Sequence, residues 1–107
     1  MTTSALTTQQ KKSLRGIAHH LSPIVAIGDK GMTKAIIEET QRALTDHELI
    51  KIKVHETDRE TRTATLAALA KATASEVLQK IGKIAILYRR NPKPNPRLSN
   101  IARYLEL

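Results

Sequence analysis

Amphipathic helical segments and short apolar runs alternate along this chain, and that alternation constrains the fold more than any other feature. Apolar side chains recur at helical spacing from Leu14 to Leu21, Pro23 ends the segment, and residues 24–27 are then all apolar. A run this short and this uniformly apolar is typical of a strand that is buried on both faces. The first part of the chain therefore predicts a helix followed by a strand.

Three helix starts are predicted from their capping residues. Thr7 with Gln10, and Thr57 with Glu60, have the spacing of capping boxes, and Thr33 is a third candidate N-cap. The apolar stripes expected to face inward are Ile36, Ile37, Ala43 and Leu44 in the second helix, and Leu66, Leu69, Ala70 and Thr73 in the third.

Three further segments have strand character. Residues 50–54 alternate between apolar and basic side chains, which indicates a half-buried strand. Residues 77–81 and 84–88 flank Gly82–Lys83, and glycine in the first position of a two-residue loop favours a type II′ hairpin turn.

The predicted order of elements is α-β-α-β-α-β-β, which is an α/β fold. Strand–helix–strand units place neighbouring strands parallel, and the hairpin adds an antiparallel pair, so we expect a mixed sheet. The apolar stripes are narrow, which predicts that the helices cover mainly one face. Lys51 and Lys53 would then lie on a partly solvated opposite face.

Composition changes near the C-terminus. We interpret residues 5–90 as one domain, Met1–Ser4 as a frayed end, and residues 91–107 as a basic tail with prolines at alternate positions from 92 to 96. Each proline biases the residue before it toward extended backbone, so we expect the tail to be extended and mobile. A short helix can follow within it, with Leu98, Ile101, Ala102 and Leu105 on one face.

The chain is strongly basic and its charge is segregated. Its 107 residues contain 18 Lys and Arg against 10 Asp and Glu, and a basic domain of this size typically binds a polyanion. Residues 11–34 have a net charge of +4, residues 89–97 another +4, and residues 35–60 a net charge of −3. With only two aromatic residues, both Tyr, the chain cannot form the multi-ring stacking surface of an RRM or of a single-strand-binding OB-fold.

The composition excludes some chemistries and compartments as well. The chain has no Cys, which rules out disulfides, thiolate-bound zinc and a thiol nucleophile. The N-terminus lacks the pattern of a signal peptide, and apolar runs do not exceed five residues, against about 20 for a membrane span. These features predict a soluble cytoplasmic protein with no membrane partner.

The residues Gly28-Asp29-Lys30-Gly31 lie between the buried strand and the second helix. Glycine lets a backbone approach a ligand closely, and the free N–H groups of a helix start suit a phosphate. Lys30 and Lys34 would add two cations. KH domains use a GxxG loop in this way to clamp a nucleic-acid backbone. The alternative interpretation is a tight β-to-α turn without a ligand.

Enzymatic alternatives are weaker. The GxxG segment lacks the spacing and the Lys-Ser/Thr ending of a Walker loop, and the four His are not paired with carboxylates in a metal-ligand spacing. His19 and His20 could serve as general acid and base for RNA cleavage, although a phosphate contact is the simpler role. Asp58 and Glu60 fall in the first turn of the third helix, where we interpret them as caps rather than as catalytic carboxylates.

Four separated motifs together resemble the YhbY family, the bacterial stand-alone versions of the CRM (chloroplast RNA splicing and ribosome maturation) domain. They are residues 14–19 (LRGIAH), 27–33 (IGDKGMT), 47–54 (HELIKIKV) and 81–89 (IGKIAILYR). The resemblance implies a four-stranded mixed sheet similar to the C-terminal domain of the third translation initiation factor. It also implies RNA binding through the GxxG loop and association with precursors of the large ribosomal subunit.

Carried over residue by residue, the resemblance assigns Gly28, Lys30, Gly31 and Thr33 to the RNA-binding loop and the helix cap. It also matches Lys51 and Lys53 to a basic strand, whereas Asp29 departs from the family pattern toward negative charge. The tail beyond Arg90 is variable in such proteins. The full set of candidate RNA-binding residues is Gly28, Asp29, Lys30, Gly31, Thr33, Lys34, Lys12, Arg15, His19, Lys51, Lys53, Arg89 and Arg90.

The sequence thus predicts a monomeric, non-enzymatic protein that binds ribosomal RNA in large-subunit precursors, with no cofactor, no metal and no catalytic residue. Two alternatives remain. One is a protein of the Alba type that binds double-stranded DNA or chromatin as a dimer, and the other is an RNA-cleaving enzyme that uses His19 or His20.

Overall fold

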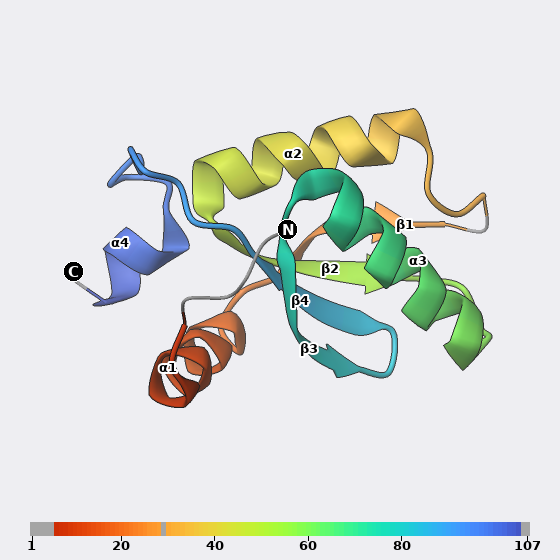
Figure 1. The fold of residues 1–107 in the computed structure, drawn as a ribbon, viewed down its shortest axis with the longest axis horizontal. Helices are drawn as coiled ribbons and strands as arrows, with labels where there is room; N and C mark the ends of the chain where they lie inside the picture. The colour runs from red at the N-terminus through yellow and green to blue at the C-terminus, as the bar shows by residue number, and fades with distance from the viewer. Residues whose placement is uncertain (1–5, 29, 106–107) are drawn as a thin grey trace.

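A four-stranded mixed sheet organises the molecule (Figure 1), seen in a computed structural model that describes residues 6–28 and 30–105, with side chains up to Ala102. The strand order is β1-β2-β4-β3. β1 and β2 are parallel, and the pairs β2–β4 and β4–β3 are antiparallel. The predicted α/β fold and mixed sheet are confirmed. The expected frayed end at residues 1–4 lies outside the described residues.

The elements follow the predicted order, with one more helix at the end. They are α1 (Thr8–Ala18), β1 (Pro23–Ile27), α2 (Lys34–His47), β2 (Leu49–Val54), α3 (Arg59–Thr73), β3 (Glu76–Ile81), β4 (Ile84–Tyr88) and α4 (Asn100–Leu105). No helix in the described part of the chain is long and apolar enough to cross a membrane.

The larger hydrophobic core lies between the sheet and the layer of α2 and α3. Alternate residues of the strands face this layer, because successive side chains of a strand point to opposite faces. Ala43 and Leu44 of the predicted α2 stripe are buried there, and Ile36 and Ile37 pack against the cluster. The core residues are Val25, Ile27, Ala43, Leu44, Ile50, Ile52, Val54, Leu66, Leu69, Ala85 and Leu87.

A second core lies on the opposite face, and it corrects the expectation that helices cover mainly one face. Leu14, Ile17 and Ala18 of α1 are buried there against Leu49 and Ile86 of the sheet. α4 packs beside α1 through Ile101 (Figure 1). The prediction failed because the narrow stripe of α1 gives no indication of which face it joins. Beyond α1 this face is open, since Ile24 and Ile81 are 46% and 55% exposed.

The caps agree with the sequence at two helices and differ at the third. Thr7 and Gln10 form the predicted capping box, and Thr33 Oγ1 accepts from the Ile36 N–H at 3.2 Å. At α3 the predicted Thr57–Glu60 box is wrong, because Asp58 is the N-cap. The Asp58 carboxylate accepts from both the N–H and the hydroxyl of Thr61, at 2.9 and 2.6 Å. These bonds satisfy the start of the helix one residue later than predicted.

The β3–β4 hairpin has the predicted turn. Gly82 has a φ of +57°, whereas Lys83 keeps a negative φ. This combination is that of a type II′ turn, in which only the first central residue adopts positive φ. The turn closes the sheet at the end where β2 finishes, because the Val54 N–H donates to the Lys83 carbonyl at 2.7 Å.

The C-terminal segment docks on the core, contrary to the expectation of a mobile tail. Glu48, which ends α2 with a φ of 61°, is 5% exposed, and its carboxylate accepts from the Ser99 hydroxyl at 2.7 Å and from the Asn91 N–H at 2.9 Å. The Asn100 side chain also donates to the Leu49 carbonyl at 2.7 Å. The predicted short helix exists as α4, but Leu98 is outside it and exposed.

Candidate nucleic-acid interface

The loop between β1 and α2 is an exposed turn with an accessible backbone. The Gly31 N–H donates to the Gly28 carbonyl at 3.0 Å, and Gly31 has a φ of +68°, which an L side chain rarely adopts. A Cβ added at either glycine would meet no atom within 4 Å, so the space beside both is open. Asp29 lies outside the described residues. A ligand can therefore reach the main chain at both glycines without displacing any side chain that the structure describes.

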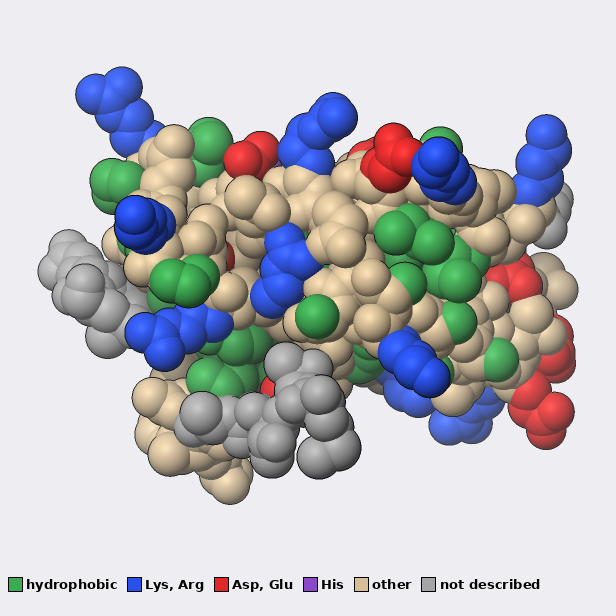
Figure 2. Space-filling view, turned by 45° about the horizontal axis from the view of Figure 1, so that its top comes forward, with side chains coloured by type: hydrophobic (Ala, Val, Ile, Leu, Met, Phe, Trp, Pro, Cys, Tyr) green, Lys and Arg blue, Asp and Glu red, His purple; other side chains and the backbone are tan. Residues whose placement is uncertain are grey.

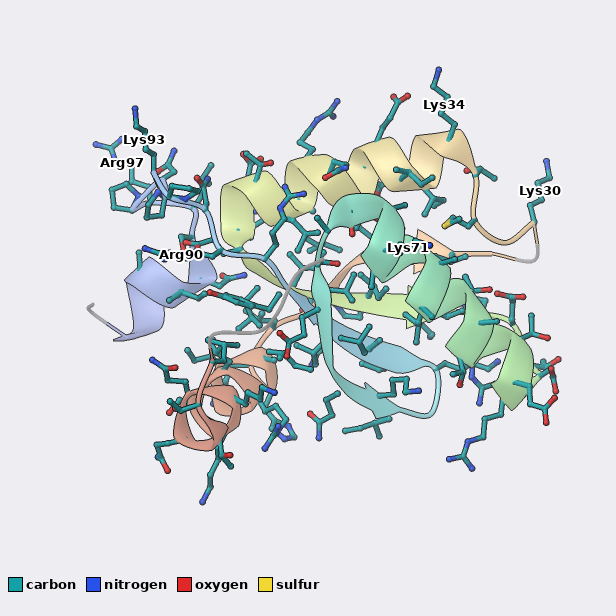
Figure 3. All side chains as sticks on the ribbon, in the orientation of Figure 1. Lys30, Lys34, Lys71, Arg90, Lys93 and Arg97 are labelled. Carbon is teal, nitrogen blue, oxygen red and sulfur yellow. The ribbon has the colours of Figure 1, made fainter. Side chains whose placement is uncertain are left out.

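The start of α2 adds donors and two cations to the same end. The Thr33 hydroxyl satisfies only one of the free N–H groups of the first turn, which leaves Lys34 and Ala35 with outward amides suited to an anion. Lys30 and Lys34 are exposed and project from this end of the molecule (Figure 3). Neither forms an ion pair with the carboxylates that the structure describes. The loop thus combines open backbone, free amides and mobile positive charge.

The sheet brings residues to this loop that the sequence analysis did not include. The His55 N–H donates to the Ile27 carbonyl at 2.8 Å, directly before Gly28. Lys83 follows across β2, through its bond to Val54. Both side chains are exposed. The parallel pairing of the first two strands would have placed His55 here, because the carboxyl ends of parallel neighbours lie at one edge.

Lys53 connects the loop to the α1 face of the sheet. It pairs with Ala26, two residues before Gly28, and is exposed. Lys51 lies on the same face, half-buried, and lines a small cavity of about 40 Å³ together with His19. Lys12 and Arg15 lie further along α1, where Lys12 is exposed and Arg15 half-buried. The structure thus brings His19 and Lys51 together, on a different face from Lys34.

Arg89 has an internal role. Its guanidinium donates to the side chain and the carbonyl of Gln41, to the Thr73 carbonyl at 2.9 Å and to the Thr45 hydroxyl at 2.8 Å. These bonds join the C-terminal ends of α2 and α3. Burial lowers the pKa of this guanidinium from its ordinary value, and the group stays charged at neutral pH. Arg89 therefore stabilises the fold, and the N–H groups that it uses for this are not free to bind an RNA phosphate.

Arg90, Lys93 and Arg97 all lie toward the end of the molecule opposite Lys30 (Figure 3). All three are exposed. Figure 2 shows that Lys and Arg side chains on the α2 side lie singly, with acidic side chains between them, rather than in one continuous patch. This surface therefore offers separate points of positive charge.

The histidines do not contribute to a metal-binding cluster in the described part of the chain. His19 and His20 are exposed at the end of α1, and the His47 ring nitrogen Nδ1 lies 2.8 Å from the Leu98 carbonyl, to which it must donate. Among the described residues no three His, Asp or Glu side chains converge on a position where they could hold a metal ion.

The chain is similar to several bacterial proteins over most of its length. It is 47% identical to a Pseudomonas aeruginosa protein named "Probable RNA-binding protein" over 100 residues, which are 94% of this chain and 96% of that one. A Haemophilus influenzae protein named "RNA-binding protein" is 46% identical over 86 residues, which are 80% of this chain and 87% of that one.

A solved structure has the same fold. The solution structure of a hypothetical Staphylococcus aureus protein superposes with a TM-score of 0.72 at 34% identity, over 82% of this chain and 92% of that one. The model of the CRS1 / YhbY (CRM) domain matches residues 6–89, which include the glycine loop, all four strands and Arg89. From these matches and from the fold, the chain belongs to the CRS1 / YhbY (CRM) domain family.

Proposed function

We propose that this protein is a non-enzymatic RNA-binding protein that associates with ribosomal RNA in precursors of the large ribosomal subunit and acts in their assembly. The observation that carries the proposal is the Gly28–Gly31 loop with the start of α2. There, open main chain, free helix amides and the ammonium groups of Lys30 and Lys34, which pair with no carboxylate that the structure describes, lie together. This combination suits the phosphate backbone of a nucleic acid.

The names of the relatives support RNA as the ligand. The ribosomal role rests on the resemblance of the four sequence motifs to stand-alone CRM proteins. We further propose that the protein acts in the cytoplasm as a monomer and recognises RNA shape and phosphate more than base identity. With two Tyr as its only aromatic residues, the chain has little with which to stack on bases.

The contact surface that we propose starts at the loop and continues onto the α1 face. Lys53 is the connecting residue, because its pairing with Ala26 places it beside the loop. Lys51 and His19 follow across the face, and Lys12 and Arg15 extend it along α1. Arg89 is not part of this surface because its guanidinium is bound internally. Arg90 lies at the far end of the molecule (Figure 3), and we do not include it in this surface.

A salt titration of binding to purified large-subunit ribosomal RNA tests the proposal. If about five phosphates are neutralised, the logarithm of the affinity should fall against the logarithm of the salt concentration with a slope of roughly −3 to −5. A slope near zero would contradict phosphate recognition. Gradient sedimentation of cell extracts should place the protein with large-subunit precursors, and its absence from those fractions would contradict the ribosomal role.

Two simple controls separate the alternative functions. An RNA-cleaving enzyme that uses His19 or His20 would shorten end-labelled ribosomal RNA during the incubation, whereas a binding protein leaves it intact. A DNA-binding protein of the Alba type would sediment as a dimer and prefer duplex DNA to RNA. We expect a monomer, intact RNA and preference for RNA.

A further inference from the structure

The structure contains a basic cavity that is separate from the glycine loop. It lies between the first half of α3 and the β3–β4 hairpin, on the side of the sheet that carries α2 and α3 (Figure 1). Its volume is about 350 Å³. The residues that line it are Arg59, Arg62, Thr63, Leu66, Lys80 and Gly82. Three of the six are cations and none is an acid.

The cations of this cavity are available to a ligand. Arg59 and Lys80 are exposed, and neither they nor Arg62 forms an ion pair with any carboxylate in the described part of the chain. Three positive charges that line one hollow repel one another, and an anion in the hollow would relieve that repulsion. The Thr63 hydroxyl adds a hydrogen-bond donor.

The residues that line the cavity are held in place by hydrogen bonds and by packing. Arg62 is half-buried, and its Nη1 donates to the carbonyls of Glu56 and Thr57 at 2.9 and 2.6 Å. These bonds hold the guanidinium plane in place, while its Nη2 and Nε donors remain for a ligand. Leu66, 4% exposed, belongs to the main core and fixes the floor. Gly82 has no side chain to narrow the hairpin side.

Two nearby carboxylates are engaged elsewhere. Glu56 Oε1 accepts from the Thr65 hydroxyl at 2.7 Å. The Asp58 carboxylate caps α3 through hydrogen bonds from Thr61, which lower the pKa of Asp58, with a smaller contribution from the Arg62 charge. Neither acid lines the cavity. The hollow thus keeps its excess of positive charge although the β2–α3 loop beside it is acidic.

The cavity lies at the same end of the sheet as the glycine loop. Ile27, which precedes Gly28, is bonded to His55, and Val54 is bonded to Lys83, which follows Gly82. Two strand spacings, about 10 Å, therefore separate the loop from the hairpin turn. The exposed side chains of His55 and Lys83 lie between them. A single nucleic-acid strand can span that distance.

We propose that the α3–hairpin cavity is a second phosphate-binding site, which takes a backbone phosphate of the same RNA strand that the glycine loop binds. This inference rests on the proposed RNA-binding function and deepens it. The ligand class follows from three convergent cations, one of them a fixed guanidinium with a free fork, which match the charge and geometry of a phosphate. The RNA strand would start at Gly28 and pass His55 and Lys83. It would then reach the cavity that Arg59, Arg62 and Lys80 line.

The test compares RNA lengths and two variants with the same change in net charge. Arg59→Ala/Lys80→Ala removes two exposed cavity cations and leaves the bonded Arg62. Lys71→Ala/Lys93→Ala removes two exposed cations elsewhere (Figure 3). Fluorescence anisotropy is measured with RNA of about four nucleotides, the length that a GxxG loop clamps, and with RNA of about twelve.

We expect the cavity variant to bind the longer RNA about tenfold more weakly than wild type. Its salt slope should be smaller by about 0.7, the value for one lost phosphate contact to a single strand. It should bind the four-nucleotide RNA as wild type does. For the longer RNA, the Lys71/Lys93 variant should lose less than half as much affinity as the cavity variant does. Equal loss in both variants would mean a general charge effect and would overturn the proposal.

Chemical shifts in unmodified protein give a measurement that does not depend on a variant. The Thr63 and Gly82 amide signals should move with the longer RNA and not with the short one. If they move with inorganic phosphate and not with RNA, the cavity is a small-anion site and the proposal is wrong. If wild type binds neither RNA, the RNA-binding function itself fails. If wild type binds the longer RNA and the cavity variant matches it, only the cavity proposal fails.

Discussion

Two basic segments of this chain, residues 11–34 and 89–97, have the same net charge of +4, yet the structure uses them differently. Lys30 and Lys34 are exposed beside an open main chain. Arg89 points inward and donates to three residues of α2 and α3. Net charge alone therefore does not identify a binding surface. Arg90, Lys93 and Arg97 of the second segment are exposed too, so the loop differs in having its cations beside open main chain and free helix amides.

The two regions also differ in how completely their polar groups are satisfied. Around Glu48 and Arg89, a buried carboxylate and a half-buried guanidinium each have several partners from distant parts of the chain. At the Gly28–Gly31 loop, one turn bond and one helix cap are the only local bonds to the described backbone. The first region should control stability and the second should control binding. The variants below test that separation.

Removing residues 91–107 should have the largest effect on stability. It deletes Ser99 and Asn91, the partners of the buried Glu48 carboxylate, and the contacts of Asn100 and Ile101. We expect the free energy of unfolding to fall by at least about 3 kcal/mol, because several hydrogen bonds to a charged carboxylate and the apolar contacts of Ile101 are lost together. Thermal unfolding by circular dichroism should show a Tm lower by more than about 10 °C. A shift below about 5 °C would mean that the segment is a mobile tail after all.

Arg89→Ala should have the next largest effect. It removes the bonds between the C-terminal ends of α2 and α3 and leaves the Thr73 carbonyl without this donor. We expect a loss of about 2–3 kcal/mol, since hydrogen bonds to a charged group contribute that much. Arg90→Ala, at an exposed position, is the control and should change the Tm by only a degree or two. RNA affinity, measured well below the lowered Tm, should be close to wild type for Arg89→Ala.

Asp58→Asn should have the smallest effect, confined to acid pH. Hydrogen bonds from Thr61 lower the pKa of Asp58 from its ordinary value of 3.8. A carboxyl group whose pKa is lower in the folded state stabilises the fold above its unfolded pKa, and that contribution is lost as the pH falls below about 4. Asn caps a helix about as well as Asp. The variant should match wild type at pH 7 and lose less stability between pH 4 and pH 2. Identical acid limbs for the two proteins would show that Asp58 does not contribute to acid unfolding.

Sequence patterns predicted those parts of the fold that depend on contacts between residues close together in the chain. The Thr33 cap and the Gly82 turn each depend on residues within a few positions, and both formed as predicted. Residues 24–27 form a strand as predicted, but the expectation that it is buried on both faces is wrong, because β1 is an edge strand in which Ile24 and Ala26 are exposed. The Thr57 cap failed since Asp58, one residue later, offers a better acceptor to the helix start.

The features that the sequence did not predict depend on contacts between distant residues. Glu48 meets Ser99 from 51 positions away, and Arg89 meets Gln41 from 48. No spacing rule relates such pairs. The sequence therefore does not distinguish Glu48, whose carboxylate is buried, from the other acids of the negative segment 35–60. His55 and Lys83 were overlooked as candidates for the same reason, since only strand pairing places them beside the loop.

The central claim is that the loop end binds RNA and the Glu48–Arg89 end does not, and Lys30→Asp tests it most directly. Lys30 is exposed, and a carboxylate near the start of α2 is favourable to the helix, so the Tm should change little. In RNA binding the same change removes a phosphate contact and places a negative charge where the backbone would lie. The measurement is gradient cosedimentation with large-subunit precursors at physiological salt, with Arg90→Asp as the matched control. We expect Lys30→Asp to be absent from the precursor fractions and Arg90→Asp to remain in them. Cosedimentation of the folded Lys30→Asp protein at the wild-type level would contradict it.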